Sequence, residues 1–300
     1  SIIDLSEGGA QPMSNGDGSI WISFNGEIYN HASLRTDLEG RGCRFRSDHS
    51  DTEVLVQGYQ SWGMRGLLDR LDGMYVFAVY DETAKRVSIA RDRIGIKPVY
   101  FTKRKGVFAF ASEIKALLAH PNVPATVGEA ALYHYLTYLT TPAPLTLFDG
   151  IYKLPAAHFM TIEADGSFTA ERYWGAVPGQ NLDAQAVAGK SAADQDLYYC
   201  QAVMERLEAS VEKRMMSDAP YGAFLSGGID SSVNVALMDR FTDDPVNTFT
   251  VGFKDHPHLN ELDHAAHVAK QFKTNHHDLN IDLTRYVTPN YVNRCRSRST

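Results

Sequence analysis

The sequence predicts two domains of different fold class: an α+β domain over residues 1–175 and an α/β domain over residues 197–300. The first part is rich in short β-like runs joined by tight turns, a pattern typical of antiparallel hairpins. The second part alternates strand-like and helix-like segments, which predicts a parallel sheet wound with helices. Between them, residues 176–196 are mostly Ala, Gly, Gln, Asp and Ser without apolar periodicity, and they are expected to form an exposed linker.

Strands of the first domain are expected where apolar runs lie between turn residues. In chain order they are Trp21–Phe24, Met74–Tyr80, Arg86–Ala90, Pro98–Thr102 and Val107–Ala111. The first strand is expected to end at the turn signal Asn25-Gly26, because Asn-Gly favours tight turns. The other four are expected to form two hairpins.

Helices of the first domain are expected where apolar residues recur every three or four positions. Ala32–Glu39 carries Leu34 and Leu38 four apart, and Thr52–Trp62 carries Leu55, Tyr59 and Trp62 on one face. A third, short helix is expected after Ser112, whose hydroxyl would cap it.

The second domain is expected to begin with a long helix and to continue with alternating strands and helices. Its expected elements are the helix Leu197–Met215, the strand Ala223–Leu225, the helix that includes Val233–Met238, the strand Val246–Phe253, the helix Leu262–Phe272 and the strand His277–Ile281.

Composition is that of an ordinary globular protein, and it excludes several classes of function. The 300 residues are 44% hydrophobic and 22% charged, and the net charge of −7 argues against a general nucleic-acid binder. Because no apolar run reaches about 18 residues, no membrane span is predicted. Cys43, Cys200 and Cys295 lie far apart, so neither a disulfide framework nor a zinc site is expected, and a cytoplasmic location fits best.

The turn Ser226–Ser232 carries the strongest indication of chemistry in the chain. It links an apolar strand to a helical segment and contains Gly227, Gly228 and three serines. This geometry places unpaired backbone N–H groups before an anion, and Asp230 is positioned to hold Mg²⁺ beside a polyphosphate. No Gly-Lys-Ser/Thr follows, so it is not a Walker A loop. The alternative is a plain glycine turn with Asp230 or Ser231 as the helix N-cap.

A second candidate site lies in the first domain around Asn25-Gly26. The amide of Asn25 and the N–H of Gly26 are two donors that can converge on one oxygen, as an oxyanion hole requires. Asp51, just before a predicted helix, offers a carboxylate for a substrate ammonium group. The alternatives are an ordinary Asn-Gly turn and a helix cap by Ser50 or Asp51.

Six motifs occur in order along most of the chain: FNGEIYNH, SDTEVL, LDGMYVFAVYD, ARDRIGIKPVYF, FASEIKALL and FLSGGIDSS. From about residue 1 to 281 this array resembles glutamine-dependent asparagine synthetase. The resemblance implies a class-II glutaminase domain with an Ntn-hydrolase-like, four-layer αββα sandwich, followed by an ATP-pyrophosphatase domain with a parallel α/β sheet. Both domains are expected to be incomplete.

The resemblance also assigns roles to matching residues. Asn25 and Gly26 would form the oxyanion hole, and glutamine would be bound by Asn25, Gly26, Glu27 and Asp51. ATP would be bound by Leu225, Ser226, Gly227, Gly228, Asp230, Ser231, Ser232 and Val251, with Asp230 also holding Mg²⁺. Arg91, Asp92 and Lys97 of the ARDRIGIKPVYF motif are expected to form a structural ion-pair network around a hairpin.

Some family features are expected to lie outside this sequence. The family uses an N-terminal cysteine as nucleophile. That cysteine, and the arginine that clamps the glutamine carboxylate, would lie upstream of Ser1. A second synthetase motif would lie downstream, and residues 294–300 (RCRSRST) have no core pattern. We therefore expect a fragment, truncated at both ends, that hydrolyses no glutamine by itself.

The implied reaction is the ATP-dependent amidation of aspartate to asparagine, with AMP and pyrophosphate as products and ammonia from glutamine. Glutamine, aspartate and ATP would be the small-molecule partners, with no nucleic acid or membrane, and a homodimer is left open. One alternative is another carboxylate acceptor, such as a sugar acid or a peptide. The other is a non-catalytic remnant that only binds partners or nucleotides.

Overall fold

The computed structural model describes residues 2–176, 183–254 and 260–282. The chain forms two compact units, residues 1–184 and 185–300. The tail 294–300 and Cys295 lie outside the described residues. No helix in the described ranges is both long and apolar enough to cross a bilayer.

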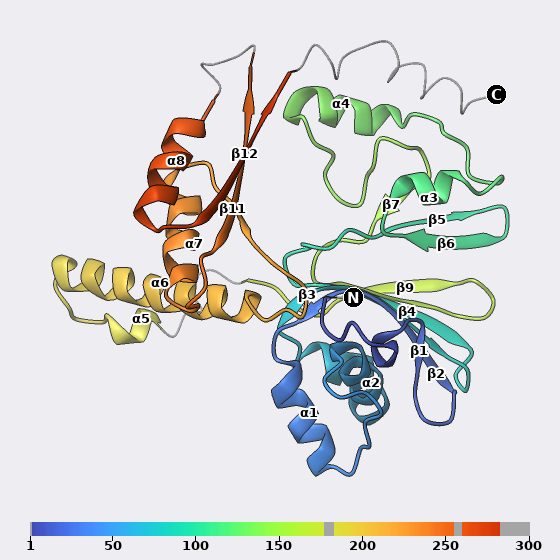
Figure 1. The fold of residues 1–300 in the computed structure, drawn as a ribbon. Coiled ribbons are helices and arrows are strands. Elements are labelled where there is room, and N and C mark those ends of the chain that lie inside the picture. The colour runs from blue at the N-terminus through green and yellow to red at the C-terminus, as the bar shows by residue number, and fades with distance from the viewer. Residues whose placement is uncertain (1, 177–182, 255–259, 283–300) are drawn as a thin grey trace. The chain divides into compact units, whose positions relative to one another are not determined.

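The first unit contains two β-sheets (Figure 1). The larger has six strands in the order β1-β2-β3-β4-β8-β9, and the smaller has three in the order β6-β5-β7. Every strand pair in these sheets is antiparallel, as the hairpin pattern predicts. The strands are β1 (Met13–Ser14), β2 (Ile20–Ile28), β3 (Gly73–Asp81), β4 (Arg86–Arg91), β5 (Tyr100–Arg104), β6 (Val107–Ala111), β7 (Tyr152–Lys153), β8 (His158–Ile162) and β9 (Phe168–Arg172).

Helices of the first unit include α1 (His31–Gly40) and α2 (Asp51–Leu68), which pack on one face of the larger sheet (Figure 1). A short 3-10 turn, Glu7–Gly9, precedes β1. The remaining helices are α3 (Ile114–Leu118), α4 (Glu129–Tyr138) and, at the boundary of the two units, α5 (Asp183–Ala186).

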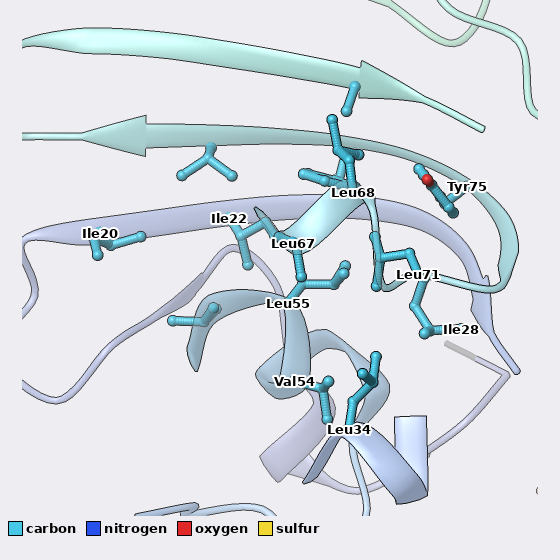
Figure 2. Packing of buried hydrophobic residues seen from close by; sticks show 14 of the residues in the cluster. Ile20, Ile22, Ile28, Leu34, Val54, Leu55, Leu67, Leu68, Leu71 and Tyr75 are labelled. Atoms are coloured by element: carbon cyan, nitrogen blue, oxygen red, sulfur yellow. The ribbon is translucent and has the colours of Figure 1, made fainter. Parts of the chain in front are cut away.

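The main core lies between α1, α2 and the larger sheet. Leu34 of α1, Val54, Leu55 and Leu67 of α2, and alternate residues of β2 and β3 fill it, as Figure 2 shows. The opposite side chains of the same sheet, including Val76, Ile89 and Met160, form a second cluster with Phe101 of the smaller sheet. The larger sheet is therefore buried on both faces in this region.

A third cluster attaches α3 to the smaller sheet through Leu117 and Ile151, with Tyr100 and Ala111 packed beside them. In contrast, Tyr133, Leu136 and Tyr138 of α4 are exposed. The α+β content and the antiparallel sheets agree with the sequence-based expectation for this part of the chain.

Two local predictions in the first unit are wrong. The strand predicted to end at Asn25-Gly26 continues to Ile28, because β2 pairs with β3 along its whole length. Ser112 does not cap α3, since the N-cap residue is Glu113 and makes no side-chain cap bond. At Asn25-Gly26, strand pairing outweighs the local turn signal.

The second unit contains a three-stranded parallel sheet in the order β10-β11-β12. Its elements are α6 (Ala192–Arg214), β10 (Ala223–Phe224), α7 (Ile229–Asp239), β11 (Asn247–Phe253), α8 (Leu262–Gln271) and β12 (Asn275–Ile281). Val235 of α7 and Ala265 and Ala269 of α8 pack with Leu225 in one cluster. The two crossover helices therefore share a core on the same sheet.

Helix α6 starts five residues earlier than the sequence predicts, inside the segment expected to be a linker. Ser191 is its N-cap, and the Ser191 hydroxyl accepts a hydrogen bond from the Asp194 N–H. A Ser followed three residues later by an acidic residue is a common helix start. Helix α5 also lies inside that segment.

The packing of α2 on β2 and β3 gives a stability prediction. Leu55 is fully buried in the main core, so Leu55→Ala is expected to lower the free energy of unfolding by about 2–5 kcal/mol. Leu136→Ala is the matched control, because Leu136 is 70% exposed on α4. Urea denaturation followed by tryptophan fluorescence measures both, and an equal effect of the two changes would contradict this description of the core.

Candidate functional site

The edge of β2 that faces away from β3 is the centre of the candidate site. Successive N–H groups of a strand point to opposite edges, so those of Phe24, Gly26 and Ile28 share one edge. The Phe24 N–H donates to Gln11 Oε1 at 2.6 Å, and the Ile28 N–H donates to Asp51 Oδ2 at 3.1 Å. Both side chains lie on the edge away from β3. The N–H of Gly26 lies between these two bonds and points to the same side.

Gly26 is required by the close approach of the neighbouring strand. A Cβ atom at this position would lie 2.1 Å from the carbonyl oxygen of Met74 and 2.7 Å from Cα of Tyr75. Any side chain would therefore force β2 away from β3. Asn25 is exposed beside it, and among the residues that the structure describes its Nδ2 makes only a long 3.4 Å bond to Ser112 Oγ.

A cavity of about 200 Å³ lies at this edge. Asn25, Gly26 and Asp51, the three candidates from the sequence motifs, line it together. It is also lined by Ile2, Gln11, Phe24, Thr52 and Lys97. Thr52 and Lys97 belong to two of the six motifs, whereas Gln11 belongs to none. The sequence analysis assigned no binding role to any of the three, and it gave Lys97 a structural role.

Asp51 is a buried carboxylate at the start of α2. It is 3% exposed, and burial raises the pKa of its carboxyl to about 6. The Ile28 N–H bond lowers that pKa, and the nearby charge of Glu27 raises it. At neutral pH the group is therefore mostly ionised, in a place where a cation would be strongly favoured.

The two other acidic residues of these motifs are also buried but differ in role. Glu53 accepts bonds from the N–H groups of Arg46 and Ser47 and from the Ser47 hydroxyl, so it fixes the loop before α2. Glu27 is 6% exposed and acts on Asp51 through its charge, but it is not among the described residues that line the cavity.

The helix-cap alternative for the start of α2 holds for the position of Ser50 but not for a cap bond from its side chain. Ser50 is the N-cap residue but its side chain makes no cap bond, and its hydroxyl is buried without a partner among the described residues. The Asp51 carboxylate accepts from the Ile28 N–H of β2, and backbone N–H groups at the start of its own helix, including that of Thr52, also lower its pKa.

The expected ion-pair network around β4 is instead a network of bonds to the backbone. Asp92 accepts from the N–H groups of Tyr75, Ile94, Ile96 and Lys97. Arg91 donates to the carbonyl oxygens of Gly95, Lys97 and Leu154. These bonds fix the loop that follows β4.

In the second unit, the turn between β10 and α7 is a compact hydroxyl-bonded loop. Ser231 Oγ accepts from the Ser226 N–H at 3.2 Å and lies 3.0 Å from Ser226 Oγ. Ser226 Oγ in turn accepts from the Gly228 N–H at 3.3 Å. Gly228, and neither Asp230 nor Ser231, is the N-cap of α7, and it makes no side-chain cap bond. The alternative in which Asp230 or Ser231 caps the helix is therefore wrong.

Gly227 is fixed by conformation and by packing. Its φ of +78° favours glycine, and a Cβ there would lie 2.5 Å from Cβ of His264 on α8. The loop therefore rests directly on the first turn of α8. The first N–H groups of α7 have no acceptor within the helix, and Ser232 Oγ is buried without a partner among the described residues. These groups suit a phosphate.

The remaining candidates for the nucleotide site, Asp230, Leu225 and Val251, differ from one another in exposure. Asp230 is exposed in the first turn of α7. Leu225 is 1% exposed and packs with Val235 of α7 and Ala265 and Ala269 of α8. Val251, in contrast, is 43% exposed on β11. The adenine contact expected of Leu225 and Val251 stays a prediction. Within the described ranges, no cluster of three or more His, Cys, Asp or Glu side chains is arranged to hold a metal ion.

Comparison with known families matches both parts of the chain. The glutamine amidotransferase domain family matches residues 1–174, and the asparagine synthase family matches residues 202–288. Asparagine synthetase [glutamine-hydrolyzing] 3 of Bacillus subtilis is 35% identical over 265 residues, which cover 85% of this chain and 40% of that protein.

Asparagine synthetase [glutamine-hydrolyzing] 1 of the same organism is 37% identical over 256 residues, with 85% of this chain and 38% of that protein covered. This chain thus spans about two fifths of the length of these curated relatives.

Among solved structures, glutamine phosphoribosylpyrophosphate amidotransferase from B. subtilis aligns over 91% of this chain and 49% of its own, with a TM-score of 0.41 and 16% identity. The family matches are decisive, since one of them covers more than half of the chain. The chain belongs to the glutamine amidotransferase family, in the group whose amidotransferase domain is followed by an asparagine synthase domain.

Proposed function

We propose that the protein is a glutamine-dependent ligase that amidates aspartate to asparagine, with ATP converted to AMP and pyrophosphate. The observation that carries the proposal is the free edge of β2, where the Gly26 N–H and the Asn25 amide lie in one cavity with the ionised carboxylate of Asp51. The asparagine synthetases that match both parts of the chain support this reaction class.

In the first unit, the proposed ligand is L-glutamine. Its α-ammonium group pairs with Asp51, and its side-chain amide lies against Asn25 and Gly26. When a nucleophile adds to the amide carbon, negative charge develops on the amide oxygen. Two fixed donors, the Gly26 N–H and the Asn25 Nδ2, stabilise that charge without reorganisation. We assign binding and oxyanion stabilisation to this chain, and we assign no nucleophile to any of its residues.

We also propose a specific fold for each of the two units. We propose a four-layer αββα sandwich of the Ntn-hydrolase type for the first unit, supported by the two hydrophobic clusters on the two faces of the larger sheet. We propose an ATP-pyrophosphatase domain for the second unit, supported by its parallel sheet and the glycine turn before α7.

In the second unit, the loop Ser226–Ser232 is proposed to bind the phosphates of ATP through the N–H groups at the start of α7. Asp230 fits a Mg²⁺ site, because Mg²⁺ in nucleotide sites commonly takes one or two carboxylates together with phosphate oxygens. When bound, the ion would neutralise charge on the polyphosphate. The exposed position of Asp230 leaves its carboxylate free to reach that side.

The acceptor is tested by product analysis of the complete protein. With ATP, Mg²⁺, glutamine and aspartate, we expect pyrophosphate and asparagine to form in equal amounts. Release of pyrophosphate with a sugar acid or a peptide, and none with aspartate, would contradict the choice of aspartate but keep the reaction class.

Asp51 gives a prediction about pH and binding. Asp51→Asn keeps an acceptor for the Ile28 N–H but removes the charge, so L-glutamine affinity is expected to fall by about 10- to 100-fold at pH 7.5. Because the pKa of Asp51 is about 6, wild-type affinity is expected to rise as pH increases through 6, while the variant stays flat. Calorimetric titration at pH 5 and 7.5 measures both, and a pH-independent wild type would contradict the role of Asp51.

The same variant is expected to be more stable than the wild type. Burial raises the carboxyl pKa from 3.8 to about 6, so the folded state prefers the protonated form. The stability that this provides is present below pH 3.8 and is lost as pH rises to about 6. The loss is about 3 kcal/mol for a shift of two pKa units. Thermal melts of Asp51→Asn should therefore show a higher Tm at pH 7.5 and little difference near pH 4.

Asp230 gives a prediction about Mg²⁺. Asp230→Ala is expected to weaken binding of a non-hydrolysable ATP analogue by about tenfold or more, only when Mg²⁺ is present, because the lost contact is charge-assisted. Asp239→Ala, an exposed residue at the other end of α7, is the control. A loss that is the same without Mg²⁺, or a loss of glutamine binding, would contradict the role of Asp230.

A further inference from the structure

The pairing between β10 and β11 ends directly before the loop Ser226–Ser232. Strand β10 is only two residues long, and its register with β11 ends at the pair Phe224 and Phe249. The last bond of this ladder runs from the Leu225 N–H to the Phe249 carbonyl oxygen at 2.9 Å. After Leu225 the chain leaves the sheet and enters the loop.

A buried hydroxyl takes the place of the next ladder bond. In a regular parallel ladder that bond would run from the Val251 N–H to the Leu225 carbonyl oxygen. Within the part of the chain that the structure describes, this bond is not made. The Leu225 carbonyl oxygen accepts instead from the hydroxyl of Thr250, a residue that is 5% exposed. Because strand side chains project out of the sheet, this bond turns the Leu225 carbonyl out of the plane of the ladder.

The replaced bond has two consequences at this end of the sheet. The Leu225 carbonyl belongs to the peptide unit that joins Leu225 to Ser226, so the bond to Thr250 fixes the direction in which the loop begins. The Val251 N–H points to the same edge of β11 as the Phe249 N–H, since successive N–H groups of a strand alternate between its edges. It is therefore left without the acceptor that a longer β10 would provide.

The later residues of the loop are supported from two helices. Ser231 Oγ, in the first turn of α7, accepts from the Ser226 N–H at 3.2 Å. Gly227 lies so close to α8 that a Cβ atom there would be 2.5 Å from Cβ of His264. Thr250 supports the loop from the side of β11, at the residue where the chain leaves the sheet. Contacts from three different elements thus set the conformation of the loop before any ligand is bound.

We propose that Thr250 is a positioning residue for the loop that binds the phosphates of ATP. Its hydroxyl ends the β10–β11 ladder at Leu225 and directs Ser226, with the N–H groups that follow it, toward the ligand. Thr250 acts through the Leu225 carbonyl oxygen and not by contact with the nucleotide. This inference rests on the proposed nucleotide site and deepens it.

Thr248 is a matched control for the loss of a buried hydroxyl. It lies two positions before Thr250 on the same strand, so both side chains project from the same face of the sheet. Thr248 is fully buried, and its Oγ1 lies 2.8 Å from Thr274 Oγ1 and 2.9 Å from His276 Nδ1. Replacing either threonine with valine leaves a polar partner without its bond, so both changes are expected to lower stability to a similar extent.

The first test measures binding of a non-hydrolysable ATP analogue with Mg²⁺ by calorimetry. Thr250→Val keeps the shape of the side chain and removes its hydroxyl, so it is expected to weaken binding by about tenfold or more. Thr250→Ser keeps a hydroxyl and is expected to retain most of the affinity. Thr248→Val is expected to bind the analogue as the wild type does. Thermal melts verify that the variants are folded and compare the stability of the two valine variants.

The second test measures amide hydrogen exchange by NMR without nucleotide. In the wild type, the Val251 N–H is expected to exchange faster than the Phe249 N–H, which the ladder pairs. In Thr250→Val the Leu225 carbonyl oxygen is free to accept from the Val251 N–H, so exchange at Val251 is expected to slow. Thr248→Val should leave it as in the wild type. Unchanged exchange at Val251 in Thr250→Val would overturn the claim that the Thr250 hydroxyl ends the ladder.

The outcomes separate this inference from the proposed function. If the wild type binds the ATP analogue and Thr250→Val binds it equally well, the role of Thr250 is wrong and the nucleotide site stands. The same conclusion follows if Thr248→Val weakens binding as much as Thr250→Val does. If the wild-type chain does not bind the analogue, the nucleotide site and the role of Thr250 are both overturned.

Discussion

The candidate amidotransferase site depends on one geometric constraint, the unpaired edge of β2 between Phe24 and Ile28. The hydrogen bonds from Gln11 and Asp51 satisfy the outer N–H groups of this edge and leave that of Gly26 between them. The other edge is held by pairing with β3, where Met74 approaches so closely that only glycine fits at position 26. The fold thus presents a backbone donor that is rigid before any ligand arrives, which is the property an oxyanion-binding group needs.

The second constraint is electrostatic. Asp51 is held in a buried position where its ionised form is costly, as its raised pKa shows. Glu27, close by and also buried, adds to that cost. A protein selected for stability alone would gain by replacing Asp51 with a neutral residue, so this cost supports the proposed role of the carboxylate in ligand binding. A ligand cation would offset it.

Sequence patterns predicted much of the fold and missed most nonlocal contacts of the site. Apolar spacing located β3, β4 and the hairpin β5–β6, because these strands have buried faces and strong turn residues between them. The prediction of a turn at Asn25-Gly26 was wrong, because pairing of β2 with β3 outweighs the turn preference of that dipeptide. Gln11 and Lys97 reach the cavity from 15 residues before Gly26 and 71 residues after it, and no local pattern encodes such a meeting. Their contribution became visible only once the register of β2 and the loop after β4 were known.

The most direct test of the proposed site is a crystal structure of the chain with L-glutamine bound. We expect the side-chain amide oxygen of glutamine to lie within hydrogen-bond distance of the Gly26 N–H and the Asn25 Nδ2, with the α-ammonium group on Asp51. Glutamine bound elsewhere, or in this cavity with its amide turned away from Gly26, would contradict the central claim that the free edge of β2 is the catalytic donor.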